Sequence, residues 1–365
     1  MKLSEPVLFV EINMNNFIFT VGKYDENQNF NIIETLATSS NEILNGKIVN
    51  IDDAKIKVKK NIEDLENKLN CIFKTVSVII DDLNYSCINI SGYKKLNGSQ
   101  LLKENISYIL NSLKLVVNEN EKKKTILHIF NSGSVLDGTK VNNLPIGLFG
   151  DFYNHELTFF LLENNDLKNV NTIFNENNLK INKILLKNYS EGVQIINLKD
   201  SDTFLRIKIG KETSSIILFD QSSFKYGQSF NFGSNIILND IMKICSIDKE
   251  IIIKFLSDKI FKEKKFKDED LLEKEYFFKK SYRKIRKKLI LDIAESRIEE
   301  ITDIILNKNI NLSFIKKKDL KVYLFFDEKI IADNFFNNFN DNFLKSTYST
   351  PELLKDFEAE ETVQN

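Results

Sequence analysis

One segment, residues 205–241, limits the fold more strongly than any other part of the chain. An alternating apolar run at 205–209 is followed by Gly210 and polar residues, and then by a second apolar run at 215–219. A third run follows, and the pattern predicts a helix that begins near Leu238. Strand, glycine turn, strand and helix is an order that allows backbone amides to surround a phosphate group. We therefore expect an α/β fold in which this segment frames a phosphate-type loop.

Length and composition place the chain among globular proteins. It has 365 residues, of which 42% are hydrophobic and 28% are charged, enough for more than one hydrophobic core. The 51 basic and 52 acidic residues nearly cancel, which excludes a generally basic nucleic-acid binder. The three cysteines show no zinc or disulfide spacing, and no apolar run approaches the ~18 residues of a membrane span. We expect a cytosolic or peripheral protein.

The phosphate-type segment has a counterpart near the N-terminus. Two apolar runs within residues 7–21 resemble those within 205–219, and Gly22 and Gly227 fall at comparable predicted turns. This internal repeat predicts two similar α/β lobes. Between the two copies, residues 83–163 mix helical and strand patterns and predict a small inserted α/β module, with a loop at 132–138.

Apolar spacing predicts the buried faces of two helices. At 52–69, Ile56, Ile62, Leu65 and Leu69 fit one face of a helix. At 331–344, an apolar stripe is strong enough for membrane contact, but its place directly after a buried strand favours packing in a core. The stripe comprises Phe335, Phe336, Phe339, Phe343 and Leu344.

Five short motifs follow one another along most of the chain. They are GKIVNI at 46–51, LHI at 127–129, LPIGLFG at 144–150, FGSNIILNDI at 232–241 and AESRIEEI at 294–301. Each is weak alone, but their order and spacing resemble those of FtsA, the bacterial actin-like cell-division family. The resemblance implies an α/β, actin-like (ribonuclease H-like) two-lobed fold with an inserted subdomain of the SHS2 type, called 1C.

The resemblance also implies subdomain boundaries and partners. Subdomain 1A would take residues 1–82 and 164–200, 1C 83–163, 2A 201–247 and 291–345, and 2B 248–290, with a disordered acidic tail at 346–365. Members of the family bind ATP between the lobes and form filaments. They hold the C-terminal tail of the tubulin-like protein FtsZ in subdomain 2B and reach the inner membrane through a C-terminal amphipathic helix.

The nucleotide motifs depart from the family pattern. The first phosphate loop, usually DIGTxK, reads EINMNN at 11–16, so Glu11 keeps a carboxylate and Asn13 replaces a glycine, since asparagine tolerates positive φ. The second, usually DIGGGTTD, reads KIGKETSS at 208–215, so Lys208 replaces the acid that organises Mg²⁺. The vestigial nucleotide-binding residues are Glu11, Asn13, Lys208, Gly210, Lys211, Thr213, Gly233 and Lys254.

The adenosine motif is also altered, because both of its glycines are lost in YLFFD at 323–327. We expect Phe325 and Phe326 to fill the space of the base and ribose. The sequence therefore predicts a chain without catalytic residues or metal ligands that requires no cofactor and hydrolyses ATP weakly or not at all. The alternative is a working actin-fold ATPase whose altered loops still bind ATP with Mg²⁺.

A basic cluster and the motif at 294–301 are candidates for partner binding. Seven of the ten residues at 279–288 are Lys or Arg, which fits a solvated helix face, a nucleic-acid contact or a site for an acidic peptide. We favour no nucleic acid, because no aromatic platform accompanies the cluster. The resemblance assigns Arg297, Glu300, Arg283 and Arg286 to the FtsZ tail, whose carboxylates arginine binds well.

The tail at 346–365 carries five acidic residues and one lysine, so anionic lipid would repel it. Our leading hypothesis is an FtsA-like scaffold at the cytoplasmic side of the inner membrane, at the division site. Its expected partners are the FtsZ C-terminal tail, other division proteins through subdomain 1C, and further copies of itself in filaments, with membrane contact left open. A scaffold of another machine, such as type IV pilus assembly, is a further alternative.

Overall fold

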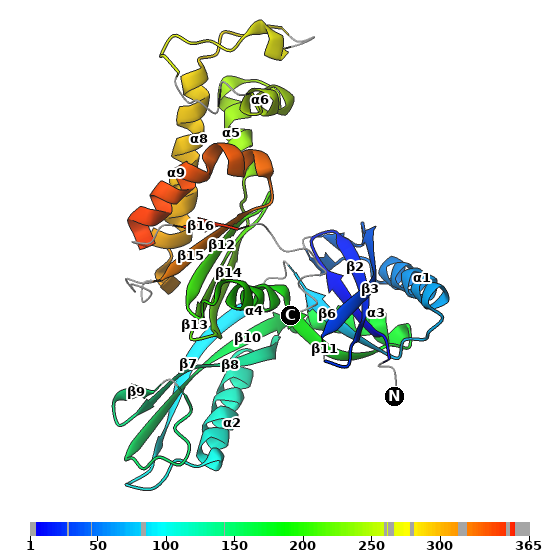
Figure 1. The fold of residues 1–365 in the computed structure, drawn as a ribbon, viewed down its shortest axis with the longest axis vertical. Coiled ribbons are helices and arrows are strands. Elements are labelled where there is room, and N and C mark those ends of the chain that lie inside the picture. Colours follow the sequence, from blue (N-terminus) through cyan, green and yellow to red (C-terminus); the bar gives the residue numbers. More distant parts are fainter. Residues whose placement is uncertain are drawn as a thin grey trace. The chain divides into compact units, whose positions relative to one another are not determined.

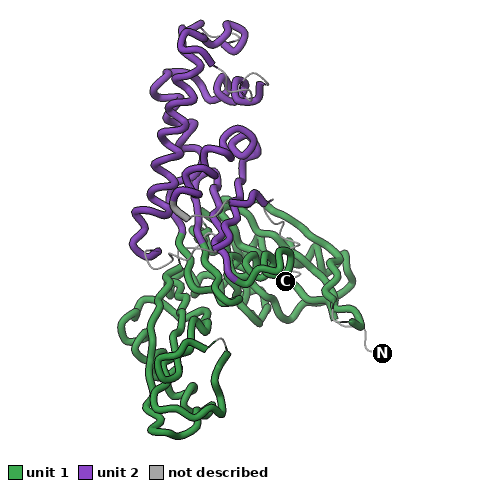
Figure 2. The backbone as a smooth tube through the Cα atoms, turned by 60° about the vertical axis from the view of Figure 1, so that its left-hand side comes forward, with its two compact units in different colours: residues 1–202, 217–228, 357–365 green, residues 203–216, 229–356 purple. Residues whose placement is uncertain are grey.

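The computed structural model describes residues 5–27, 29–44, 46–81, 85–141, 143–258, 261, 266–277, 281–312, 320–347 and 351–354. The chain forms two compact units (Figure 2). Unit 1 comprises Met1–Asp202, Ile217–Gln228 and Phe357–Asn365, and unit 2 comprises Thr203–Ile216 and Ser229–Asp356.

A five-stranded sheet in the order β11-β6-β1-β2-β3 is the centre of unit 1 (Figure 1). Its strands are β1 Val7–Ile12, β2 Asn16–Tyr24, β3 Phe30–Ser39, β6 Thr75–Ile80 and β11 Lys180–Leu186. Strand β1 runs antiparallel to β2 and parallel to β6, which runs parallel to β11. Two short strands, β4 Ile43–Leu44 and β5 Lys47–Ile48, form a separate pair.

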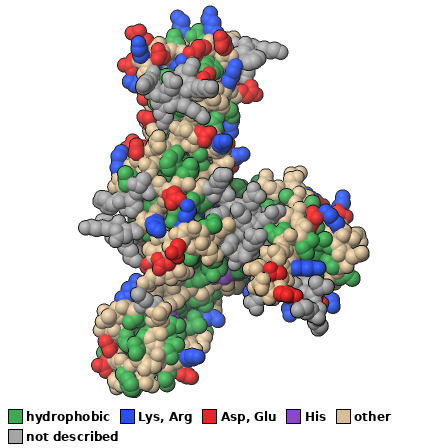
Figure 3. All heavy atoms as spheres, in the orientation of Figure 1, with side chains coloured by type: hydrophobic (Ala, Val, Ile, Leu, Met, Phe, Trp, Pro, Cys, Tyr) green, Lys and Arg blue, Asp and Glu red, His purple; other side chains and the backbone are tan. Residues whose placement is uncertain are grey.

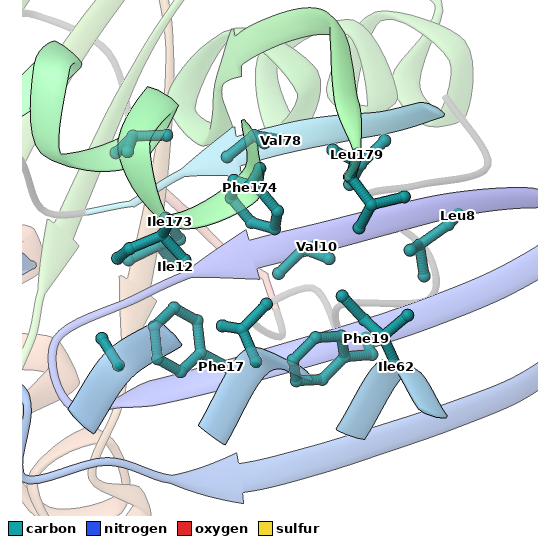
Figure 4. Packing of buried hydrophobic residues seen from close by; sticks show 14 of the residues in the cluster. Leu8, Val10, Ile12, Phe17, Phe19, Ile62, Val78, Ile173, Phe174 and Leu179 are labelled. Atoms are coloured by element: carbon teal, nitrogen blue, oxygen red, sulfur yellow. The ribbon is translucent and has the colours of Figure 1, made fainter. Parts of the chain in front are cut away.

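Helices α1 Ile51–Leu69 and α3 Asn164–Glu176 cover one face of this sheet. Figure 4 shows Val10 and Phe19 of the strands packed together with Ile62 of α1 and Phe174 of α3. Because alternate residues of β1 and β2 point toward these helices, the two strands contribute one apolar face each to a single core. Such close packing is the main stabilising contribution expected for this half of the chain.

Helix α1 forms where predicted but buries a different face. Ile62 and Leu65 are buried, whereas 67% of Ile56 is exposed, so the inward orientation predicted for Ile56 is wrong. Ile56 and Leu65 are about two and a half turns apart on the helix and therefore point in opposite directions. Ala54 and Val58 complete the buried face instead.

The predicted inserted module is a four-stranded antiparallel sheet in the order β7-β10-β8-β9, packed against one helix. Its elements are β7 Ser86–Lys95, α2 Lys103–Asn120, β8 Lys124–Leu136, β9 Thr139–Val141 and β10 Phe152–Glu163. Strand β8 continues through most of 132–138, so the loop predicted there is wrong. Its buried serine hydroxyls find partners on β10: Ser132 bonds to Thr158, and Ser134 lies 3.0 Å from the hydroxyl of Tyr153.

Helix α4 Lys187–Lys199 follows β11 without a loop and was not predicted. Its Gly192 packs so closely on Phe219 that an added Cβ would lie 2.1 Å from the ring. The neighbouring Phe224 stacks on Phe219 and also on Phe160 of the inserted module. Residues 217–228 therefore form part of the core of unit 1.

The second five-stranded sheet has the order β14-β13-β12-β15-β16. Its strands are β12 Phe204–Ile209, β13 Ser214–Asp220, β14 Ser223–Phe230, β15 Lys321–Phe326 and β16 Glu352–Leu353. Strand β12 is parallel to β15, and β15 is parallel to β16. The first sheet has the same order when β1, β2, β3, β6 and β11 are matched to β12, β13, β14, β15 and β16, so the topology supports the predicted internal repeat.

Two predictions about these sheets are wrong. Gly22 lies inside β2 and Gly227 inside β14, not in turns; close contacts with Phe30 and with Tyr85, respectively, leave no room for a Cβ. Part of the tail predicted to be disordered is also regular, because helix α9 Lys329–Thr347 extends into it, and Leu354 donates a backbone hydrogen bond of 2.9 Å to Leu324 and continues the β15–β16 pairing. Residues 348–350 and 355–365 of the predicted tail lie outside the described part.

The helices of unit 2 are α5 Asn235–Cys245, α6 Lys249–Leu256, α8 Lys287–Thr302 and α9 Lys329–Thr347, with shorter turns η1 Lys274–Phe277, η2 Asp303–Asn307 and η3 Ile310–Leu312. Phe335, Phe339 and Phe343 of α9 are fully buried, which confirms the core role predicted for this stripe. None of the described helices is both long and apolar enough to cross a membrane.

Candidate functional site

The second phosphate-type loop is a tight turn between β12 and β13 in unit 2. The amide of Gly210 donates to the carbonyl of Thr213 at 2.9 Å and closes the turn. The amide of Asn235, at the start of α5, donates to the carbonyl of Lys211 at 3.0 Å. Gly233 is required here because a Cβ would lie 2.4 Å from the carbonyl oxygen of Gly210. The structure thus brings four predicted site residues together.

Lys208 and Asp327 form an ion pair at the edge of this loop. Strands β12 and β15 end side by side, with Ile209 opposite Phe326, and Asp327 is the next residue. Its carboxylate lies 3.3 Å from the ammonium group of Lys208 and accepts the backbone N–H of Lys211 at 3.3 Å. Asp327 was not among the predicted site residues, because its role depends on which strand lies beside β12.

On α6, the lysine that the structure links to the loop is not the one predicted for the nucleotide site. Glu212 accepts a hydrogen bond from the side-chain amide of Asn235, whose oxygen in turn accepts one from Lys249 at 3.0 Å. Lys254, the lysine predicted for the nucleotide site, lies on α6 and donates to the carbonyl of Glu275 at 2.9 Å. Lys249 is therefore the α6 lysine that the structure links to the loop.

The two phenylalanines of the adenosine motif pack inside unit 2. Phe325 is fully buried, and the guanidinium carbon of Arg206 lies 4.8 Å from the centre of its ring. The ring of Phe326 contacts that of Phe339 on α9 at 5.2 Å between centroids. Both rings are thus fixed by neighbours within their own unit.

The first phosphate-type loop, in unit 1, follows the same backbone pattern. The amide of Asn13 donates to the carbonyl of Asn16 at 3.1 Å, as Gly210 does to Thr213. In addition, the side-chain oxygen of Asn13 accepts the N–H of Asn16 at 3.0 Å. Asn13 does not adopt a positive φ, so the reason given for it is wrong: its side chain stabilises the turn instead.

Glu11 belongs to a buried cluster of charges in unit 1. The ammonium group of Lys187, the first residue of α4, lies 2.8 Å from the carboxylate of Glu11 and 3.1 Å from that of Asp81. Burial opposes the charge of Lys187, but the carboxylates of Asp81, Glu11 and Glu191 outweigh it and raise the pKa of Lys187 well above its ordinary value. Burial raises the pKa of Glu11, a shift that Lys187 opposes.

The residues predicted to bind the FtsZ tail lie on or just before α8. Arg297 donates to Asp240 of α5 and to Glu300, the latter at 2.6 Å, and 27% of its side chain is exposed. Arg286 directly precedes α8, Arg283 lies three residues before Arg286, and both are exposed. Arg286 and Arg297 lie about 16 Å apart along the helix, so the structure places them on one element but not in one contact cluster.

The basic cluster at 279–288 is not a helix face. Residues 281–286 precede α8 and have no helical structure, Lys288 pairs with Asp268 at 2.6 Å, and buried Lys287 pairs with Glu273. Lys279 and Lys280 lie outside the described residues. Figure 3 shows acidic and basic side chains mixed at the end of unit 2 that carries α6 and the start of α8.

Comparison with known proteins gives sequence relatives of one kind. No protein-family model matches the chain. It is 23% identical over 322 residues to the cell division protein FtsA of Buchnera aphidicola subsp. Schizaphis graminum (strain Sg), covering 87% of this chain and 75% of the relative. It is 18% identical over 248 residues to the cell division protein FtsA of Borreliella burgdorferi (strain ATCC 35210 / DSM 4680 / CIP 102532 / B31), covering 67% and 60%.

The structure resembles a solved chain described as the PilM-PilN type IV pilus biogenesis complex, with a TM-score of 0.55, 9% identity and coverage of 98% and 93%. That likeness shows the actin-like fold, and four curated relatives carry the name FtsA. The chain is a divergent FtsA-like protein. In this FtsA-like chain, an aspartate at the end of a central parallel strand contacts a lysine of the same unit in both units. The pairs are Asp81 with Lys187 in unit 1 and Asp327 with Lys208 in unit 2.

Proposed function

We propose that this FtsA-like chain is a cell-division protein that helps to assemble and anchor the FtsZ ring at the division site, on the cytoplasmic side of the inner membrane. The similarity to curated FtsA proteins, which extends over 87% of the chain for one of them, supports this role. The observation that carries the second half of the proposal, a scaffold with weak or no ATP hydrolysis, is the Lys208–Asp327 pair.

ATP with Mg²⁺ does not fit the residues of unit 2. Lys208 places a positive charge where the family has the acid that organises Mg²⁺, and like charges repel strongly near a protein surface. The N–H of Lys211, which would face a phosphate, is bonded to Asp327. The alternative of a working actin-fold ATPase is therefore the less supported one.

Arg297 supports docking of the acidic FtsZ tail on α8. Its contacts with Asp240 and Glu300 use Nε and Nη1, and a guanidinium group has five N–H donors. The side chain is therefore held in place while it retains donors for a carboxylate of a partner. Arg283 and Arg286 would extend the positive surface along the peptide.

Fluorescence polarisation with a labelled FtsZ C-terminal tail peptide tests this docking. We expect Arg297→Glu to reduce affinity by at least tenfold, about 1.4 kcal/mol. Because that change also places a third acid beside Asp240 and Glu300, the pair Arg283→Glu and Arg286→Glu provides a second test. Lys321→Glu, an exposed change at the start of β15, is the control. Unchanged affinity in both arginine variants would remove α8 from the proposal.

Nucleotide titration tests the scaffold part of the proposal. We expect neither ATP nor ADP, with or without Mg²⁺, to raise the unfolding temperature of the chain, since a ligand that binds only the folded state must stabilise it. A Mg²⁺-dependent rise with ATP would favour the working ATPase instead. Pull-down with the FtsZ tail peptide separates the proposed role from a pilus-assembly scaffold, for which the PilM likeness gives fold similarity alone.

The inserted module offers a second partner surface. Several large apolar side chains are exposed on and beside the LPIGLFG segment. Figure 3 shows hydrophobic side chains on the surface of the inserted module. They are Leu102, Leu144, Ile146, Leu148, Phe149 and Phe152. An exposed apolar group of this size is typical of protein contacts. We assign the module to subdomain 1C and propose that it binds other division proteins or further copies of the chain in filaments.

A further inference from the structure

The internal repeat places two aspartates at equivalent positions. Asp81 follows β6 and Asp327 follows β15, directly after the residues that pair with Ile12 and Ile209. The backbone N–H of Asp81 donates to the carbonyl of Ile12 at 2.9 Å, and that of Asp327 to Ile209 at 3.3 Å. Both carboxylates thus lie at the carboxyl ends of neighbouring parallel strands, which is where open α/β sheets bind their ligands.

In unit 2, the carboxylate of Asp327 is bound by the kinds of groups that bind a phosphate. It pairs with the ammonium group of Lys208 through one oxygen and accepts the backbone N–H of Lys211 through the other. The same oxygen approaches Gly210 so closely that a Cβ there would lie 2.8 Å away. A lysine, a loop amide and a glycine that admits close approach are the parts of an anion site on a strand-to-strand turn.

We propose that Asp327 is a built-in anion that occupies the phosphate position of loop 208–213. This inference deepens the proposed lack of ATP turnover and rests on it. A phosphate group reaches Lys208 and the amide of Lys211 only by displacing the Asp327 carboxylate, so the loop keeps one conformation whatever the nucleotide concentration. The ligand class that the loop would otherwise accept is a phosphate monoester or inorganic phosphate.

In unit 1, the equivalent aspartate pairs with a lysine of helix α4. Asp81 is also held by a lysine of its own unit, since Lys187 lies 3.1 Å away and binds Glu11 as well. In each unit, the aspartate at the strand end is thus paired with a lysine of that unit. In unit 2, the carboxylate of Asp327 competes with an anionic ligand for Lys208 and the amide of Lys211. Removing that carboxylate should therefore have a measurable effect on phosphate binding in unit 2.

Phosphate titration of Asp327→Asn tests the proposal. Asparagine keeps the shape of the side chain and removes its charge. Phosphate replaces chloride stepwise at constant ionic strength. As the phosphate concentration increases, we expect the unfolding temperature of Asp327→Asn to rise and that of the wild type to stay constant. The dissociation constant of phosphate should fall by about tenfold or more. Asp333→Asn, an exposed change on α9, should behave as the wild type.

A double variant locates the gained phosphate. Lys208→Gln combined with Asp327→Asn should lose the response of Asp327→Asn, because the cation that binds phosphate is gone. If Asp327→Asn does not fold, Asp327→Ser replaces it, as serine also removes the charge. The proposal is overturned if the wild type responds to phosphate as strongly as the variant, or if a folded variant shows no response. Neither result bears on FtsZ-tail binding, which has its own assay.

Discussion

Lys187 shows at the scale of one residue how a charge is kept inside unit 1. Its side chain is 10% exposed and contacts two carboxylates, so it is desolvated but paired. Because the folded pKa of Lys187 lies above that of a free lysine, its contribution to stability is complete below pH 10.5 and is lost as pH rises through the folded pKa. Removing one member of such a cluster leaves the others buried without compensation.

We therefore expect Lys187→Met to lower the free energy of unfolding by about 3–5 kcal/mol. Urea denaturation followed by circular dichroism measures this loss. Lys183→Met changes an exposed lysine of β11 and should stay within about 0.5 kcal/mol of the wild type. A Lys187 variant as stable as the Lys183 control would show that the cluster contributes little.

His128 provides a pH-sensitive contact in the same unit. Its Nε2 accepts the backbone N–H of Leu186 at 3.3 Å, which only the neutral ring can do. Burial lowers the pKa of His128 to about 4 from an ordinary value of 6.5. Because this base binds its proton more weakly when folded, its contribution is complete above pH 6.5 and is lost as pH falls toward 4.

We expect the free energy of unfolding to fall by up to about 3 kcal/mol through this residue between pH 6.5 and pH 4. Glutamine accepts a backbone N–H without titrating, so His128→Gln should show a flatter profile over that range. His155 is present in both proteins and contributes equally to both curves. Equal steepness in wild type and variant would contradict the assignment.

Sequence patterns identified the positions of Glu11, Lys208 and Gly210 but not their partners. Asp327 and Lys187 escaped notice because their contacts depend on strand order and on the register of β12 with β15. Asn13 was chosen as a site residue for a positive φ that it does not adopt. The chemistry of one residue can be predicted from its type, whereas its ion-pair partner requires the fold.

At the scale of elements, apolar periodicity predicted most strands and helices of both sheets, since alternate residues of each strand meet the same core. Helix α4 escaped because its buried face includes Lys187, Ser190, Glu191 and Gln194, so it lacks an apolar stripe. Strand β16 escaped because two residues are too few to show a period, and because acidic residues follow it. Among the described residues, the pairing of β16 with β15 is extended by the hydrogen bond from the amide of Leu354 to Leu324.

Strand β16 should add to the stability of unit 2. We expect a chain that ends at residue 350 to be about 1 kcal/mol less stable than one that ends at residue 354, because the latter keeps the bond from Leu354 to Leu324. Chemical denaturation of this matched pair isolates the strand from the residues beyond it. In the full chain, the amide of Leu354 should exchange with deuterium more slowly than the amides of a free chain end. If the two truncated chains are equally stable and the Leu354 amide exchanges as fast as a free chain end, β16 has no stabilising role.

At the scale of the whole molecule, the repeat is visible in the sequence because both copies need the same apolar runs to form the same sheet. The charged residues at the strand ends follow no such constraint. The copies differ where Glu11 corresponds to Lys208, whereas Asp81 and Asp327 agree in position and type. An acid in one copy and a lysine in the other each require an opposite charge. Lys187 supplies it in unit 1 and Asp327 in unit 2.

Because Lys187 and Asp327 supply internal charges where a nucleotide would otherwise bind, we expect assembly to be independent of nucleotide. If the chain forms filaments as proposed, the amount pelleted by ultracentrifugation should be the same with ATP, ADP or no nucleotide, because no nucleotide alters the loop in either unit. In Asp327→Asn, where phosphate groups gain access to Lys208, nucleotide should change the pelleted amount, while Asp333→Asn should resemble the wild type. Assembly of the wild type that requires ATP would show that the internal charges do not replace the nucleotide and would favour the alternative of a working ATPase.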